Sequence, residues 1–218
     1  MTLIISAHGK DFVVLGADSR GTMVDQGGNR VEINTEQKIV QVGKQVSVLL
    51  YGDAAAARFL IAESKKQAGF DRLDVAAAAK ALWTVGRSQL SQIPPLAWKE
   101  VPSFGLIVSG VQRGPKSRKI PRSIGLYSSE GFFPREYPRY SIKGKPLIAM
   151  FLFARRYKED YTEDEMVRLV AQALYDTMNI DGDVGGDLNI AIIDSSGTRS
   201  VPKGDLRSMI DAWGRPIL

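Results

Sequence analysis

The sequence opens, after Met1, with Thr2-Leu3-Ile4-Ile5-Ser6-Ala7, and a second apolar run follows at Phe12-Val13-Val14-Leu15-Gly16-Ala17-Asp18-Ser19. The segment between them, His8-Gly9-Lys10-Asp11, is rich in turn-forming residues, so we predict a β-hairpin with His8 exposed at its turn. Removal of Met1 would leave a hydroxyl and a free α-amine on Thr2. The first strand would then present a nucleophile and a base on one residue.

Later segments repeat this pattern of hairpins followed by helices. The predicted elements are a hairpin over 38–52, helices from Asp53 to about Gly69 and from Asp74 toward Leu90 (ended by Pro94-Pro95), strands over 104–112 and 123–127, and a helix from about Pro146. The best-marked helix begins at the capping box Thr162-Glu163-Asp164-Glu165 and stops before Asp181-Gly182. Strands over 188–194 and 198–201 and a helix over 203–213 follow.

The order of these elements predicts an α+β fold. Two helices follow strands twice, and the strands are joined by hairpins instead of crossover connections. This order favours antiparallel sheets with helices packed on their outer faces. The prolines and glycines are spread along the chain without a linker-like tract, so we expect one domain over residues 1–218.

Composition excludes several kinds of site. The chain has no cysteine and a single histidine, which argues against disulfides, thiolate chemistry and His-rich metal sites, and we expect no metal and no cofactor. The segment 181–187 does not form an EF-hand, because Gly185 and Ile192 occupy ligand positions. No signal peptide or membrane span is evident, so a soluble cytoplasmic protein is expected.

The net charge of +5 leaves a nucleic-acid partner open, but the excess is concentrated in residues 113–122. The glycine and prolines of this segment favour a solvated hairpin loop over a binding surface. We therefore expect neither nucleic acid nor a membrane as a partner.

Three further residues can come near Thr2 and serve its chemistry. Asp18 ends the strand that pairs with the first, and Lys38 opens the next hairpin. A lysine beside Thr2 would stabilise its alkoxide and favour the neutral amine, while Asp18 would neutralise that lysine. Gly52 lies at a strand exit before a helix, where its N–H can face an oxyanion.

Taken together, these residues make the whole chain resemble the proteasome β-type subunits of the N-terminal-nucleophile hydrolases, and the related bacterial HslV peptidase. The matching stretches are residues 2–7, 13–20 and 38–42, the spacing of Lys38 to Gly52, residues 162–165, Asp181 with Gly185-Gly186, and the ending 201–202, 213–214 and 217–218. The resemblance implies a four-layer αββα sandwich. It also implies that Thr2 is the nucleophile, supported by Asp18, Lys38, Asp181 and the Gly52 N–H.

The resemblance extends to substrate binding and assembly. Thr22 would pair with substrate backbone, while Gly21, Val40, Leu50 and Ala54 would line the first specificity pocket and suit a neutral side chain. Glu36 or Arg58 at the rim would modify that preference. Members form stacked rings of six or seven subunits, so we expect self-assembly and a peptide or unfolded protein as substrate, and an ATPase regulator is left open.

The chain also departs from the family pattern. Lys143 and Val184 occupy positions where family members usually carry serines that support the nucleophile's amine, and Tyr51 replaces a small residue before Gly52. These departures keep two alternatives open beside the threonine peptidase: an inactive ring-forming scaffold, and an acyl transferase of the same fold.

Overall fold

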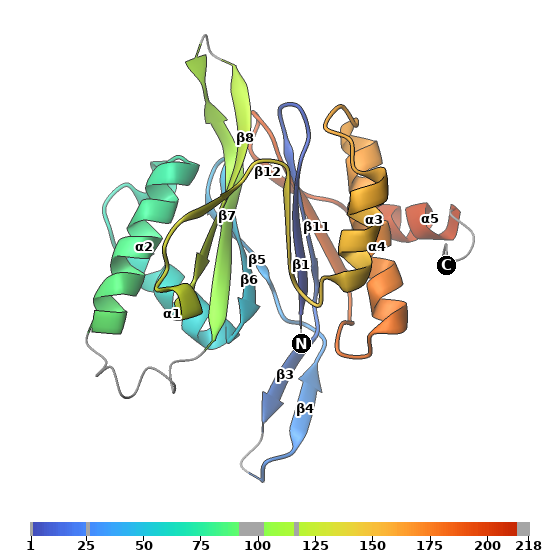
Figure 1. The fold of residues 1–218 in the computed structure, drawn as a ribbon, viewed down its shortest axis with the longest axis horizontal. Coiled ribbons are helices and arrows are strands. Elements are labelled where there is room, and N and C mark those ends of the chain that lie inside the picture. The colour runs from blue at the N-terminus through green and yellow to red at the C-terminus, as the bar shows by residue number, and fades with distance from the viewer. Residues whose placement is uncertain (1, 25–26, 92–102, 116–117, 213–218) are drawn as a thin grey trace.

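The computed structural model describes residues 2–24, 27–91, 103–115 and 118–212. Two five-stranded antiparallel sheets lie face to face (Figure 1). The first sheet has the order β10 (Tyr140–Gly144), β1 (Leu3–His8), β2 (Val13–Asp18), β11 (Leu188–Ile193) and β12 (Thr198–Ser200). The second has the order β5 (Ile39–Gly43), β6 (Val46–Gly52), β7 (Phe104–Arg113), β8 (Lys119–Tyr127) and β9 (Arg135–Tyr137).

Helices cover the outer face of each sheet (Figure 1). They are α1 (Ala54–Lys65) and α2 (Val75–Ser91) on the second sheet, and α3 (Leu147–Arg156), α4 (Glu163–Ile180) and α5 (Lys203–Ala212) on the side of the first. The predicted α+β class and four-layer αββα sandwich are therefore confirmed. No helix in these described ranges is long and apolar enough to cross a bilayer.

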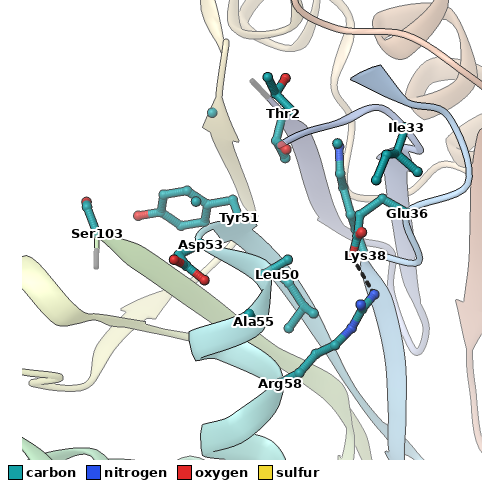
Figure 2. A pocket seen from close by; sticks show the side chains of 15 residues that line it. Thr2, Ile33, Glu36, Lys38, Leu50, Tyr51, Asp53, Ala55, Arg58 and Ser103 are labelled. Atoms are coloured by element: carbon teal, nitrogen blue, oxygen red, sulfur yellow. Dashed lines mark ion pairs between the residues drawn. The ribbon is translucent and has the colours of Figure 1, made fainter. Parts of the chain in front are cut away.

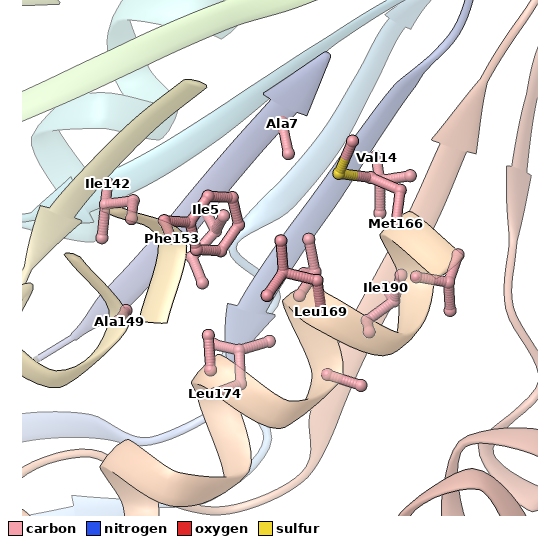
Figure 3. Close-up of a cluster of buried hydrophobic side chains, with 14 of the residues drawn as sticks. Ile5, Ala7, Val14, Ile142, Ala149, Phe153, Met166, Leu169, Leu174 and Ile190 are labelled. Carbon is pink, nitrogen blue, oxygen red and sulfur yellow. The ribbon is translucent and has the colours of Figure 1, made fainter. Parts of the chain in front are cut away.

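Strand β1 is buried on both faces, which explains its nearly continuous apolar sequence. Leu3, Ile5 and Ala7 belong to the cluster that packs against α3 and α4. Figure 3 shows Ile5 and Ala7 in this cluster. Ile4 points the other way, into the core between the sheets, because side chains alternate along a strand. The predicted pairing with β2 is confirmed, with Ile4 opposite Ala17.

The helix starts follow the predicted caps. Asp53 Oδ1 accepts from Ala56 N at 2.8 Å, and Asp74 caps α2 in the same way. The capping box of Thr162 and Glu165 is present at the start of α4. Helix α1 ends at Lys65, before the predicted Gly69, and a 3₁₀ turn (Phe70–Arg72) follows.

Several sequence predictions are corrected by the structure. His8 is only 3 % exposed, because its turn is covered by the β9–β10 connection and Tyr157 donates to the His8 carbonyl. The hairpin β3 (Gly21–Val24) and β4 (Arg30–Ile33), which extends below the sheets in Figure 1, was not predicted, and neither were β9 and β10. Within the basic segment, only the tip between β7 and β8 is loop, and 116–117 lie outside the described residues. The same holds for Pro94-Pro95 and for the ending from Trp213.

Candidate active site

A cleft of about 840 Å³ opens at the end of the sandwich where β1 begins (Figure 2). Seven of the predicted catalytic and substrate-binding residues line it: Thr2, Gly21, Thr22, Lys38, Leu50, Gly52 and Ala54. Ile33, Glu36, Tyr51, Asp53, Ala55, Arg58, Ser103 and Gly144 complete the wall. Asp18, Val40 and Asp181 are not part of it, although Asp18 lies directly behind Lys38.

Asp18 links Leu3, the residue after Thr2, to Lys38. Its Oδ1 accepts from the backbone N of Leu3 at 2.9 Å and from Lys38 Nζ at 2.7 Å. Its Oδ2 accepts from the backbone N atoms of Arg20 and Gly185 at 3.3 and 3.2 Å. One carboxylate therefore fixes both the residue next to Thr2 and the lysine across from it.

Lys38 is held almost entirely inside the protein, with 3 % of its surface exposed, and Asp18 is fully buried. Burial lowers the pKa of Lys38, and the Asp18 carboxylate opposes that shift. Its Nζ also donates to the carbonyl of Arg20 at 2.6 Å. An ammonium has three hydrogens, so one remains for the cleft that Lys38 lines together with Thr2.

Strand β10 and the residue after it hold the backbone of Thr2 on the side of β1 away from β2. Lys145 N donates to the Thr2 carbonyl at 2.9 Å, and Gly144 has a φ of +94°. A Cβ on Gly144 would lie 1.8 Å from the Thr2 oxygen, so only glycine fits there. Lys145 Nζ pairs with Asp181 at 3.3 Å and with Asp183 at 3.1 Å. Asp181 thus reaches Thr2 through Lys145, a residue that sequence analysis did not single out.

Gly52 also requires glycine, because its φ is +81° and a Cβ would lie 2.2 Å from the carbonyl of Ser103. Leu50 N donates to the Lys38 carbonyl at 2.9 Å, whereas Asp53 N donates to Ser103 on the other side. Amides alternate along a strand, so the Gly52 N–H points to the same side as that of Leu50. That side is the one on which Lys38 meets the cleft.

The cleft has two ends (Figure 2). At one end, Arg58 forms an ion pair with Glu36 and donates to the carbonyl of Gln37 at 2.8 Å. At the other end lie Tyr51, Asp53 and Ser103. Val40 instead packs against the core beneath α1 and α2.

Two of the three positions that depart from the family pattern, Val184 and Tyr51, have well-defined surroundings. Val184 is buried in the core beside α4, with 1 % of its surface exposed. Tyr51 does not obstruct the end of the cleft near Arg58, because its ring turns over Gly105 toward Tyr127, with ring centroids 5.9 Å apart. The described residues contain no group of three or more histidine, aspartate or glutamate side chains placed to hold a metal ion.

Comparison with known proteins finds proteasome β subunits. The sequence is 27 % identical over 191 residues to a proteasome subunit beta of Streptomyces griseus, covering 85 % of this chain and 63 % of that subunit. Two proteins of Salmo salar, named proteasome subunit beta type-6-B like and type-6-A like, are each 24 % identical over 205 residues, or 92 % of this chain and 87 % of theirs. No protein-family model matches the sequence.

Proposed function

We propose that this chain, which belongs to the proteasome β-type family, is a threonine-type peptidase that uses Thr2 as its nucleophile once Met1 has been removed. The observation that carries the proposal is the Asp18 carboxylate, which binds Leu3 N and Lys38 Nζ with one oxygen. This bond holds the end of β1 beside a buried cation in an open cleft.

The reaction follows from these positions. The α-amine, with an ordinary pKa near 7.7–8.0, takes the proton of the Thr2 hydroxyl as the oxygen attacks the peptide carbonyl. The Lys38 ammonium stabilises the alkoxide and favours the neutral amine. The protonated amine then gives its proton to the leaving nitrogen, and an ester on Thr2 remains. Water, activated by the same amine, hydrolyses that ester.

The oxyanion of each tetrahedral intermediate would be bound by the Gly52 N–H. That group lies on the strand that also carries Leu50, and α1 begins two residues later. The positive end of the α1 dipole adds to the stabilisation of negative charge. Asp181 acts as a positioning residue in this scheme, since Lys145 holds the Thr2 carbonyl and pairs with that carboxylate.

Substrate side chains would enter the end of the cleft lined by Gly21, Leu50, Ala54 and the Glu36–Arg58 pair. Because each of these two charges neutralises the other, an uncharged side chain fits best next to the cleaved bond. Thr22, on the edge of β3, would pair with substrate backbone. Val40 packs away from the cleft, so its contribution would be through the packing beneath Leu50.

We further propose that the chain assembles with copies of itself into stacked rings of six or seven subunits, with the clefts facing an inner chamber. The support is the similarity to proteins named as proteasome subunits. A peptide or unfolded protein would be the substrate. A partner ATPase that feeds the chamber rests on the family resemblance alone.

The test is covalent labelling of the processed protein. Intact mass establishes whether Met1 is gone, and a peptide β-lactone should then add once per subunit, on the N-terminal peptide. Thr2→Ser, which keeps a hydroxyl, should retain the adduct, and Thr2→Ala should lose it. An adduct that persists in Thr2→Ala would overturn the proposal.

A second candidate is a ring-forming scaffold without activity. Val184, buried and apolar where family members have a serine, favours it. A fully processed Thr2 terminus that takes no adduct, in an assembly of ring size, would decide for the scaffold. An acyl transferase would instead form the adduct and pass its acyl group to an added amine faster than to water.

A further inference from the structure

Three lysines surround Thr2: Lys38, Lys143 and Lys145. Two of them are bonded to carboxylates, Lys38 at 2.7 Å and Lys145 at 3.1 and 3.3 Å. Lys143 differs, because none of the ion pairs among the described residues involves it. Its charge must therefore act on something other than a carboxylate partner.

The Lys143 side chain points into the space between the two sheets. In the β1–β10 pair, Lys143 lies opposite Ile4, whose side chain belongs to the core between the sheets. Directly opposed residues share a face of the sheet. Accordingly, Lys143 Nζ lies over the ring of Tyr127, 4.7 Å from its centre, and 5.7 Å from that of Tyr137.

The rings of Tyr127 and Tyr137 hold the Lys143 ammonium in a fixed position. The Tyr127 and Tyr137 hydroxyls are 2.5 Å apart and hydrogen-bonded, and Tyr51 packs on Tyr127 and lines the cleft. Burial raises the pKa of the Tyr127 phenol and raises that of Tyr51 to about 12. Both phenols therefore stay neutral at ordinary pH. The ring faces of Tyr127 and Tyr137 hold the Lys143 ammonium without a carboxylate to cancel its charge.

Thr2 lies on the same face as Lys143. It precedes Ile4 by two residues, so its side chain also turns toward the second sheet, and it lies diagonally from Lys143 across the strand pair. Such diagonal neighbours are about 7 Å apart, within reach of a long side chain.

We propose that Lys143 is a positioning residue for the peptidase: seated on Tyr127 and Tyr137, it supplies a second positive charge beside Thr2 and keeps the freed α-amine in its basic form. The inference rests on the proposed role of Thr2 as nucleophile and deepens it. It assigns a task to a lysine that neither the cleft lining nor the ion pairs involve.

The other charges around Thr2 do not replace this contribution. They are Asp18 at the end of β2, Glu36 and Lys38 before β5, Asp53 and Arg58 at the start of α1, Lys145 after β10, and Asp181 and Asp183 after α4. Asp18 offsets part of the charge with which Lys38 acts on Thr2, and Arg58 with Glu36 form a neutral pair. The surplus carboxylates, at Asp53 and beside Lys145, are reached by solvent, where water screens them most strongly.

The experiment titrates the amine itself, so it does not depend on activity. The full chain is produced behind a cleavable leader that leaves Thr2 as the first residue. An amine-reactive anhydride is then applied over a range of pH, and labelling of the N-terminal peptide is followed by mass spectrometry. Lys143→Met should move the half-maximal labelling up by about half to one pH unit, since a charge at this distance in a partly buried site has that effect.

Two control variants test whether the positive charge of Lys143 causes the shift. Lys143→Arg keeps a cation that stacks well on tyrosine and should titrate like the parent. Lys10→Met removes the same charge from the exposed turn at the far end of β1 and should not shift the midpoint. If Lys143→Met does not fold, Lys143→Gln takes its place.

The outcomes separate the two proposals. No shift in Lys143→Met, or an equal shift in Lys10→Met, overturns the role of Lys143. A shift confined to Lys143→Met supports it, and the acid limb of kcat/KM should then move in the same direction. If the β-lactone fails to label a Thr2 terminus that titrates as expected, the peptidase proposal fails and the electrostatic one stands.

Discussion

Strand β1 has a buried polar cluster at each of its ends, and the two clusters are built differently. At the start of β1, the cluster is ionic, with Asp18 and Lys38 beside an open cleft. At the other end, it is neutral and closed: the hydroxyls of Ser6, Ser109 and Ser123 lie 2.8 to 3.0 Å from one another, and His8 Nε2 lies 2.8 Å from Ser123 Oγ.

This difference between the two clusters shows which end of β1 contains buried charge and which contains only neutral hydrogen bonds. His8 Nδ1 faces the carbonyl of Pro138 at 3.2 Å, which can only accept, so Nδ1 donates and Nε2 accepts from Ser123. The far cluster thus joins the sheets with neutral hydrogen bonds alone. Of the two ends of β1, only the end beside the cleft has a buried ion pair.

The largest effect should come from removing the buried cation. Lys38→Met leaves the fully buried Asp18 without its partner, so the free energy of unfolding should fall by about 3–5 kcal/mol. Peptide hydrolysis should fall by about 10²-fold or more, as for loss of an oxyanion-stabilising group. Urea denaturation and initial rates measure the two losses.

The double variant Lys38→Met with Asp18→Asn separates the effect of the ion pair on stability from its effect on activity. It removes both charges, so much of the stability should return while activity stays lost. A double variant with restored activity would mean that the ion pair only stabilises the fold.

The free energy of unfolding that the His8 cluster contributes should decrease at acid pH. Burial lowers the pKa of His8 from 6.5 to about 4, and the hydrogen bond to Pro138 opposes this shift. The unfolded chain therefore takes up the proton first as the pH falls, and the free energy of unfolding declines from about pH 6.5 downward, by about 3 kcal/mol at pH 4.

His8→Gln removes this titration. Denaturation curves of the two proteins between pH 7 and pH 4 should converge toward acid, because only the parent loses the His8 contribution. Parallel curves across that range would show that His8 titrates normally, contrary to its burial.

A smaller effect is expected at the hydroxyls. Ser123→Ala removes the group that joins His8 to the other two serines and should cost about 1–3 kcal/mol of stability with unchanged kcat. Ser141 is the matched control, since its buried hydroxyl has no hydrogen-bond partner in the described chain. Ser141→Ala should therefore be neutral, and an equal loss in both variants would contradict the account of the cluster.

The sequence predicted the ionic end of β1 well and the neutral end not at all. Asp18 and Lys38 could be brought together because both end or open strands of consecutive hairpins near the start of the chain. The serine cluster joins residues more than a hundred positions apart, so no local pattern marks it. The prediction that His8 is exposed was wrong for the same reason. In the hairpin alone the His8 side chain would be exposed, and it is buried only by the later β9–β10 connection.

For the cleft residues too, those carried by one local segment could be predicted, and those that depend on long-range strand pairing could not. Gly52 was expected in the site from its place at a strand exit, and Leu50 and Ala54 from the family resemblance. All three line the cleft with Thr2, because one strand and the helix after it carry them. Lys145 was missed, since its importance depends on which strand pairs with β1, and β10 is too short and too irregular in sequence to predict. Val40 was expected from the resemblance to line the pocket, but its side chain packs on the helix side of its sheet and is not part of the cleft wall.

The close contact of Gly144 with the Thr2 carbonyl has a consequence for maturation. Because β10 and the Asp18 carboxylate grip the backbone at Thr2 and Leu3, β1 cannot slide along its neighbours by one residue. In the proposed peptidase, the position of the Thr2 hydroxyl would be set by strand register and not by the free end. Removal of one residue too many would leave this position empty instead of shifting another residue into it, so Met1 would have to be removed at a single bond.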